Sequence, residues 1–143
     1  MGMTQKKILL IEDDYLDVIN VQRTLKKLRI EHELFVAHNG VDGLALLTGN
    51  SPDRKKVQPD VILLDINMPK MNGLEFLRIV KNYYSLNNIK IFILTTSAEE
   101  YDRIAAENLG VTGYILKPFD TDHQENKKSA ADMNFLLQEL MMN

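Results

Sequence analysis

The sequence predicts an α/β fold in which a parallel sheet of five strands is covered by helices on both faces. Short unbroken apolar runs alternate with amphipathic stretches along the chain, and these runs lack the polar alternation of a half-exposed strand. Right-handed crossovers leave few topologies, and the flavodoxin-like doubly wound order 2-1-3-4-5 suits a chain of 143 residues. We expect one domain over residues 1–143, with a core at about 7–119 and a last helix at about 131–142.

Each element has its own pattern. Apolar runs predict strands at 7–11, 33–37, 61–64, 89–94 and 113–116. Apolar residues three or four positions apart predict the helices, and a last stripe predicts one near the end of the chain. These residues are Val18, Val21, Leu25 and Leu28; Val41, Leu44 and Ala45; Phe76, Leu77, Val80 and Tyr84; Tyr101, Ile104, Ala105 and Leu109; and Met133, Leu136, Leu137, Leu140 and Met141.

Polar stretches without periodicity predict two irregular segments. Residues 49–59 contain two prolines and the basic run 54–56, which predicts a loop. Residues 120–129 are also polar and irregular, so we expect the last helix to begin only after them.

Composition excludes several classes of function. Cysteine is absent, which excludes disulfides, thiolate metal sites and cysteine nucleophiles. The net charge of -3 comes without a basic face or arm, so we expect no nucleic-acid partner. No apolar run reaches the length of a membrane span and no signal-peptide core is present, which predicts a cytoplasmic protein with no membrane partner. The three histidines, His32, His38 and His123, show no metal-ligand spacing.

Side chains capable of chemistry follow four of the five predicted strands. Glu12 and Asp13 follow the first strand, Asp65 the third, Thr95 the fourth and Lys117 the fifth. Because the carboxyl ends of parallel strands share one edge of a sheet, these groups should gather there. Clustered carboxylates repel one another unless a cation joins them, and carboxylate, water and phosphate oxygens suit Mg²⁺ better than zinc. Lys117 and the Thr95 hydroxyl could each bind a phosphoryl oxygen.

Taken singly, each residue has an ordinary structural interpretation. An acidic pair such as Glu12-Asp13 often caps a helix, and Asp14 fits that role best. Asp65 alone would suit a turn, Thr95 a strand end and Lys117 a solvated loop. Their joint occurrence at four strand ends, in this order, favours a site.

The motifs resemble the receiver domain of two-component response regulators. The matching residues are Glu12-Asp13, Asp65 with Met68-Pro69 and Gly73, Thr95, and Lys117-Pro118-Phe119, and the resemblance runs from about Lys7 to Phe119. It implies that Asp65 accepts a phosphoryl group from a phosphohistidine on a sensor histidine kinase or a phosphotransfer protein.

The resemblance also implies a metal and a switch. Mg²⁺ would be held by Asp13, Asp65 and the backbone carbonyl of Asn67, with Glu12 acting through the waters of the ion. Lys117 would pair with Asp65 or its phosphoryl group, and the Lys117-Pro118 peptide bond is usually cis in relatives. Thr95 would move to bond the phosphoryl oxygen while Tyr114 turns inward. Asn67 and Ser97 occupy the positions at which the family tunes the loss of the phosphoryl group.

The sequence does not identify the downstream partner or the oligomeric state. The chain resembles stand-alone receivers, which act by binding an unidentified downstream protein, and the 49–59 loop resembles that of regulators paired with bacterial phytochrome kinases. Met133, Phe135, Met141 and Met142 offer a homodimer surface on the last helix, although ordinary core packing is the preferred interpretation for Met133 and Met141.

Two other functions compete with this interpretation. A phosphatase of the haloacid dehalogenase type also uses an aspartate nucleophile and Mg²⁺, but it needs an acid two residues later, where this chain has Asn67. A flavodoxin-like binding module without phosphotransfer is the third interpretation. We expect no enzyme with turnover but a phosphoacceptor that catalyses its own phosphorylation and dephosphorylation with Mg²⁺.

Overall fold

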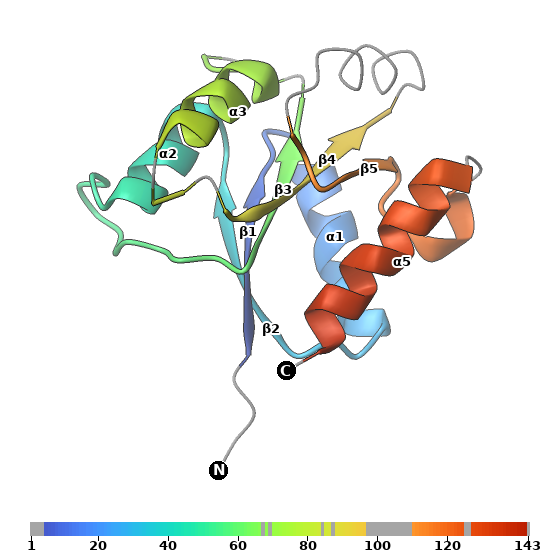
Figure 1. The fold of residues 1–143 in the computed structure, drawn as a ribbon. Helices are drawn as coiled ribbons and strands as arrows, with labels where there is room; N and C mark the ends of the chain where they lie inside the picture. Colours follow the sequence, from blue (N-terminus) through green and yellow to red (C-terminus); the bar gives the residue numbers. More distant parts are fainter. Residues whose placement is uncertain are drawn as a thin grey trace.

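The protein forms the predicted parallel five-stranded sheet (Figure 1). The computed structural model describes residues 5–66, 68, 70–83, 85–86, 88–96, 110–124 and 127–142. The strands pair in the order β2-β1-β3-β4-β5, which confirms the predicted topology. Their bounds are β1 Lys6–Ile11, β2 His32–Ala37, β3 Val61–Asp65, β4 Lys90–Thr95 and β5 Gly113–Leu116.

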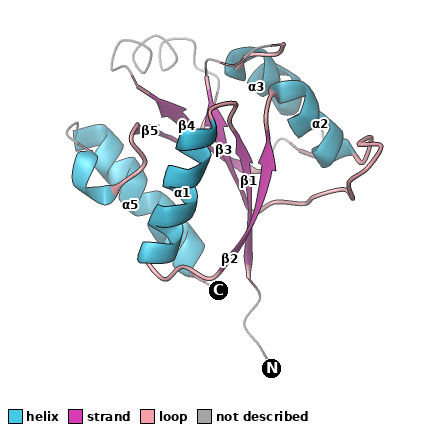
Figure 2. Cartoon of the chain, turned by 180° about the vertical axis from the view of Figure 1, so that it is seen from behind, coloured by secondary structure: helices cyan, strands magenta, loops and turns pink. Residues whose placement is uncertain are grey.

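Helices cover both faces of the sheet. Figures 1 and 2 show α1 and α5 on one face and α2 and α3 on the other. The helix expected from Tyr101 to Leu109 lies outside the described residues, so the helix labels pass from α3 to α5. The bounds are α1 Tyr15–Lys27, α2 Gly40–Thr48, α3 Gly73–Asn82 and α5 Lys127–Met141, with a short 3₁₀ helix, η1, at Thr121–His123.

The strands are apolar because both of their faces are buried. Along β1, Ile8 and Leu10 belong to the core beneath α1 and α5, whereas Leu9 and Ile11 belong to the core beneath α2 and α3. All four side chains are fully buried. Successive side chains of a strand point to opposite faces, so a continuous apolar run fills two cores at once.

The helices α1 and α3 begin at residues whose side chains bond free backbone N–H groups of the first turn. Asp14 caps α1 and accepts a hydrogen bond from the Leu16 N–H at 2.9 Å, which confirms its predicted role. Asn72 and Glu75 form a capping box at the start of α3, with the Asn72 side chain accepting from Glu75 N–H at 2.9 Å. Both helices therefore start beside the carboxyl edge of the sheet, where β1 and β3 end.

The segment from Gly49 to Pro59 is a loop, as predicted, and it is fixed to the sheet and to α2. Val57 is buried, and its N–H donates to the Leu46 carbonyl at 2.9 Å. The Arg54 guanidinium donates to the Val36 carbonyl at 2.8 Å. The loop therefore has a defined course despite its polar composition.

The C-terminal region differs in detail from the sequence prediction. The last helix begins at Lys127 rather than near residue 131, and η1 occupies part of the segment expected to be irregular. Met133 is buried, as expected for core packing, but Met141 is 58% exposed, so core packing is the wrong interpretation for Met141. The buried stripe follows Met133, Leu136 and Leu140, and the residue after Leu140 turns toward solvent.

Side chains from this region cover the outer edge of β5. Gln124 accepts a hydrogen bond from the Leu116 N–H at 3.1 Å and donates to the Leu116 carbonyl at 2.8 Å, as a neighbouring strand would. Asp132 of α5 accepts from the Tyr114 N–H at 2.9 Å. An edge strand with unpaired backbone groups invites pairing with another chain, and these side chains occupy those groups.

Within the described residues, every helix is too short or too polar to cross a lipid bilayer.

Candidate functional site

The predicted strand ends meet at one pocket. Asp65 is the last residue of β3, Glu12 follows β1 directly and Lys117 follows β5 directly. A pocket of about 250 Å³ opens between them. The residues that line it are Glu12, Asp13, Asp14, Asp17, Asp65, Thr96 and Lys117.

The Lys117 ammonium lies at the centre of this charge cluster. Its Nζ is 2.8 Å from Glu12 Oε1, 2.9 Å from Asp17 Oδ2 and 3.1 Å from Asp65 Oδ1. The Lys117 side chain is only 10% exposed, and those of Glu12 and Asp65 are 1% and 8% exposed. One cation thus holds together carboxylates that would otherwise repel one another in a partly dry site.

Burial perturbs the protonation of all three groups. Burial raises the pKa of Glu12 to about 8, although the Lys117 ammonium opposes this rise and the Asp65 charge adds to it. Burial also raises the pKa of Asp65, again against the effect of Lys117. Burial alone would lower the pKa of Lys117, but Glu12, Asp17 and Asp65 together raise it above its ordinary value. Lys117 therefore keeps its proton, and its charge only partly offsets the cost of burying the Glu12 and Asp65 carboxylates.

The donor set fits a hard divalent cation. One oxygen each from Glu12, Asp13 and Asp65 lies within 4.8 Å of the others. Glu12 Oε1 is buried, and its contact with Lys117 is an ion pair that leaves it without a hydrogen-bond partner. A further cation at the three carboxylates would supply the missing positive charge, and oxygen-only ligands favour Mg²⁺-like or Mn²⁺-like ions over zinc.

Close backbone packing fixes Asp65. A Cβ atom at Gly73 would lie 2.5 Å from the Asp65 carbonyl oxygen and 2.9 Å from Ile66 Cα. The Gly73 N–H donates to the Ile66 carbonyl at 2.9 Å. The glycine of the sequence motif is therefore required because α3 begins directly against the end of β3.

Backbone and side-chain contacts fix Lys117 from two sides. Its N–H donates to the Thr95 carbonyl at 2.7 Å, which joins the end of β5 to the end of β4. The carbonyl of the buried Phe119 accepts from the Thr24 hydroxyl at 2.8 Å and from the Asn20 amide at 3.3 Å, both on α1. The Lys117-Pro118 peptide bond is cis, as the family resemblance implies.

The predicted switch residues lie near the pocket but are buried. Thr95 is the last residue of β4 and is 2% exposed, and Tyr114 on β5 is 8% exposed. Of the two consecutive threonines, only the exposed Thr96 lines the pocket. Asn67 and Ser97, predicted to tune dephosphorylation, lie outside the described residues, and so does the Asn67 carbonyl proposed as a metal ligand.

Sequence reasoning missed two contributors to the site. Asp17 contacts Lys117 from the first turn of α1, and Thr24 fixes the loop after Lys117. A signal for Asp17 existed, because it is an acidic residue in the first turn of the helix that follows Glu12 and Asp13 directly. The role of Thr24 depends on the docking of α1 against a segment 95 residues away, which no local pattern reveals.

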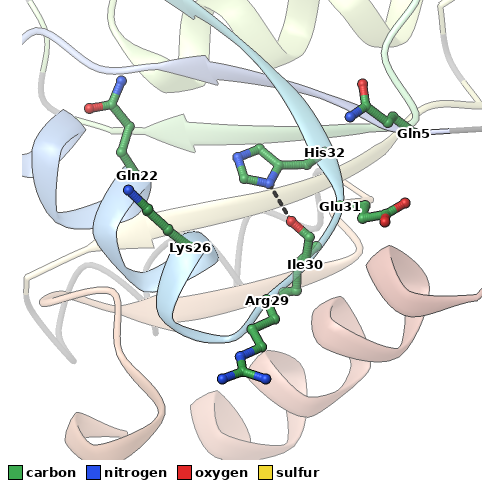
Figure 3. Close-up of a pocket in the computed structure, with 7 residues that line it drawn as sticks. All are labelled: Gln5, Gln22, Lys26, Arg29, Ile30, Glu31 and His32. Carbon is green, nitrogen blue, oxygen red and sulfur yellow. Dashed lines mark hydrogen bonds between the residues drawn. The ribbon is translucent and has the colours of Figure 1, made fainter.

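A second hollow, shown in Figure 3, lies at the opposite edge of the sheet. It is bounded by the end of α1 and the starts of β1 and β2, and its volume is about 450 Å³. The His32 ring bonds the Ile30 carbonyl at 2.7 Å, and the polar side chains around it are exposed or half-buried. This hollow lacks gathered carboxylates, so the candidate site is the pocket around Asp65.

Comparison with known proteins agrees with this geometry. Residues 8–127 match the response regulator receiver domain, and the chain therefore belongs to that family. The family resemblance expected from the motifs is confirmed.

Similar proteins include a curated response regulator and a solved bacteriophytochrome response regulator. Response regulator Rcp1 of Synechocystis sp. is 39% identical over 112 residues, which cover 78% of this chain and 76% of Rcp1. A solved structure of the Mn²⁺-bound form of Rcp1 has a TM-score of 0.76 at 34% identity and covers 96% of each chain. The bacteriophytochrome response regulator AtBRR has a TM-score of 0.82 at 30% identity, covering 99% of this chain and 96% of that one.

Another similar structure is that of a phosphorylated protein. The cyanobacterial phytochrome response regulator RcpA, solved in phosphorylated form, has a TM-score of 0.74 at 28% identity and covers 96% of this chain and 94% of that chain. Some relatives are much longer than this chain. The matching region spans 14% of the sensor histidine kinase CheAY and 52% of the transcriptional regulatory protein CrdR, both of Helicobacter pylori.

Proposed function

We propose that this receiver domain accepts a phosphoryl group on Asp65 from a phosphohistidine of a sensor histidine kinase or a phosphotransfer protein. The observation that carries the proposal is the position of Asp65. Its carboxylate lines an open pocket, is fixed at the end of a buried strand and has Lys117 Nζ 3.1 Å from Oδ1. The solved structure of phosphorylated RcpA, a relative of similar fold, supports the same chemistry.

Transfer needs an ionised Asp65 and a neutralised pocket. An oxygen of the Asp65 carboxylate attacks the phosphorus, the P–O bond forms as the P–N bond to the imidazole breaks, and the imidazole leaves with that electron pair. Lys117 stabilises the ionised carboxylate before transfer and donates a hydrogen bond to a phosphoryl oxygen after it. Phosphoryl transfer depends mainly on positioning and charge neutralisation, which these residues provide.

The cofactor that we propose is Mg²⁺, held by Asp13 and Asp65 with the Asn67 carbonyl, and with Glu12 acting through waters of the ion. When bound, the cation would neutralise the facing carboxylates and the phosphoryl oxygens. The Mn²⁺-bound structure of Rcp1 and the carboxylate cluster of this chain support a divalent ion at this place.

The signal would leave the site through β4 and β5. We propose that the Thr95 hydroxyl moves to the phosphoryl oxygen and that Tyr114 responds, because Thr95 ends the strand beside Asp65 and Tyr114 lies in the next strand, which pairs with β4. The hydrogen bond from the Tyr114 N–H to Asp132 joins β5 to α5 directly. A downstream protein would bind this β5–α5 face. Because Phe135 and Met141 are exposed apolar residues on α5, a second copy of the chain is one such partner.

Acetyl phosphate with Mg²⁺ tests the proposal without a kinase. The wild-type protein should gain one phosphoryl group per chain by intact mass, and a chelator should prevent it. Asp65→Asn should gain none, and Asp13→Ala should lose the reaction or its dependence on Mg²⁺. Stoichiometric labelling of Asp65→Asn would assign the phosphoacceptor elsewhere. Steady turnover of a phosphate monoester at saturating Mg²⁺ would instead indicate a phosphatase of the haloacid dehalogenase type.

A further inference from the structure

Lys117 has a carboxylate partner beyond those implied by the resemblance. Asp17, in the first turn of α1, accepts a hydrogen bond from Lys117 Nζ at 2.9 Å. The hydrogen bond from the same nitrogen to Asp65 Oδ1 is longer, at 3.1 Å. The contact with Glu12 Oε1, at 2.8 Å, is an ion pair without hydrogen-bond alignment. Besides its short contact with Glu12, the ammonium therefore donates hydrogen bonds to both Asp17 and Asp65.

The position of Asp17 relative to Lys117 is fixed by the fold. Asp14 caps α1 just before Asp17, and Thr24 farther along the same helix bonds the Phe119 carbonyl in the loop after Lys117. The helix that carries Asp17 is thus tied to the segment that carries Lys117. The Asp17 side chain is 33% exposed, so its contact with the 10% exposed Lys117 forms at the mouth of the pocket.

We infer that Asp17 competes with Asp65 for Lys117 and so limits how strongly Lys117 pairs with a phosphoryl group on Asp65. The inference rests on the proposed function and assigns a regulator of that same site. An ammonium has three N–H donors, and a phosphoryl group on Asp65 adds oxygens that need them. Asp17 withholds one donor and places a negative charge 2.9 Å from the ammonium that would bind the phosphoryl group. Asp17 is a positioning residue, because it acts through Lys117.

An acidic residue in the first turn of α1 also has an ordinary explanation. A carboxylate there interacts favourably with the positive end of the helix dipole, whatever it does for Lys117. Asp14 separates the two roles, because it caps the same helix just before its first turn and also lines the pocket, whereas its side chain bonds the Leu16 N–H. Asp14→Asn removes one negative charge from the same pocket and keeps a good helix cap. It is therefore the matched control for Asp17→Asn.

The first measurement is the acetyl phosphate concentration that half-saturates the phosphorylated fraction at saturating Mg²⁺. Asp17→Asn should lower this concentration about fivefold relative to wild type, since an amide binds the ammonium less strongly than a carboxylate and releases it toward Asp65. Asp14→Asn should stay within about twofold. Equal effects of the two variants would reduce the role of Asp17 to general charge and overturn the inference, as would a higher half-saturating concentration for Asp17→Asn.

The second measurement needs no phosphoryl group. Proton–nitrogen NMR of the lysine side chains should give a Lys117 ammonium signal protected from solvent exchange, which Lys117→Arg identifies by its loss. Asp17→Asn should shift this signal and speed its exchange with water, and Asp14→Asn should leave it unchanged. A Lys117 signal insensitive to Asp17→Asn overturns the inference even if Asp65 is phosphorylated. A shifted signal in a protein that acetyl phosphate fails to label would instead refute the proposed function.

Discussion

Because the Glu12 carboxyl is buried, we expect its contribution to the stability of the fold to fall as the pH rises, and Glu12→Gln should remove that contribution to the pH dependence. Glu12 has a folded-state pKa of about 8 against an ordinary value of 4.5, chiefly because burial disfavours its charged form. A raised carboxyl pKa stabilises the folded state fully below the unfolded-state value, and this contribution is lost as the pH rises toward the folded-state value. In the metal-free protein, the stability contribution of Glu12 is therefore lost between about pH 4.5 and about pH 8.

The size of the effect follows from the width of this window. Where only the folded state holds the proton, each pH unit lowers the free energy of unfolding by about 1.4 kcal/mol. Between pH 5 and pH 8, ionisation of Glu12 therefore lowers the free energy of unfolding by about 4 kcal/mol. The amide of Glu12→Gln keeps the shape but replaces one of the two accepting oxygens, which costs about 1 kcal/mol at any pH. We expect the variant to be slightly less stable than wild type at pH 5 and about 3 kcal/mol more stable at pH 8.

Urea unfolding in a chelator, followed by circular dichroism from pH 5 to pH 8, measures this crossover. Asp14→Asn serves as the control, because it removes an exposed carboxylate of the same pocket and leaves the buried Glu12 in place. Mg²⁺ should narrow the gap at pH 8, since a cation at the carboxylates compensates the ionised Glu12. A difference between Glu12→Gln and wild type that is constant across the pH range would refute the reasoning.

Substitutions at three further positions test how the fold positions the site. Gly73→Ala should cost about 2 kcal/mol in urea unfolding and slow labelling by acetyl phosphate, because its Cβ would lie 2.5 Å from the Asp65 carbonyl oxygen; unchanged labelling would contradict this. Thr24→Val should cost about 1 kcal/mol, because it removes the 2.8 Å hydrogen bond to the Phe119 carbonyl at equal volume; a neutral or stabilising change would count against that anchor. Asp132→Ala should cost about 2 kcal/mol by leaving a buried N–H of β5 without its acceptor, while Asp132→Asn, which keeps an acceptor, should cost less; equal losses would show that the hydrogen bond contributes little.

The sheet and the carboxyl-edge site were predictable because they follow from local pattern and topology. An apolar run buried on both faces predicts β3, and its last residue, Asp65, must lie at the carboxyl edge. In a parallel sheet all strands end at the same edge. Glu12 and Lys117, which follow two other strands, can therefore be placed beside Asp65 from the sequence alone. Asp14 was assigned to the cap of α1 by its position alone, and the observed bond to Leu16 agrees.

The remaining features depend on tertiary contacts that no periodicity encodes. Gln124 bonds the backbone of β5 as a neighbouring strand would. To predict this contact, one would have to know that β5 is an edge strand and that the following segment folds back onto it. Met141 follows the buried Leu140 in sequence, but at the end of α5 its side chain points toward solvent rather than into the core. The hydrogen bond of Asp17 to Lys117 depends on how α1 docks beside the end of β5, so helix spacing suggests its side of the helix but not its partner.

The chemical location of the label tests the central claim most directly. The protein is incubated with acetyl phosphate and Mg²⁺, then treated with borohydride, which reduces an acyl phosphate to the alcohol and so converts the labelled aspartate into homoserine. Peptide mass spectrometry then finds the converted position. We expect conversion at Asp65 alone, dependent on Mg²⁺. Conversion at Asp13 or at another carboxylate, with Asp65 intact, would contradict the assignment of the phosphoacceptor.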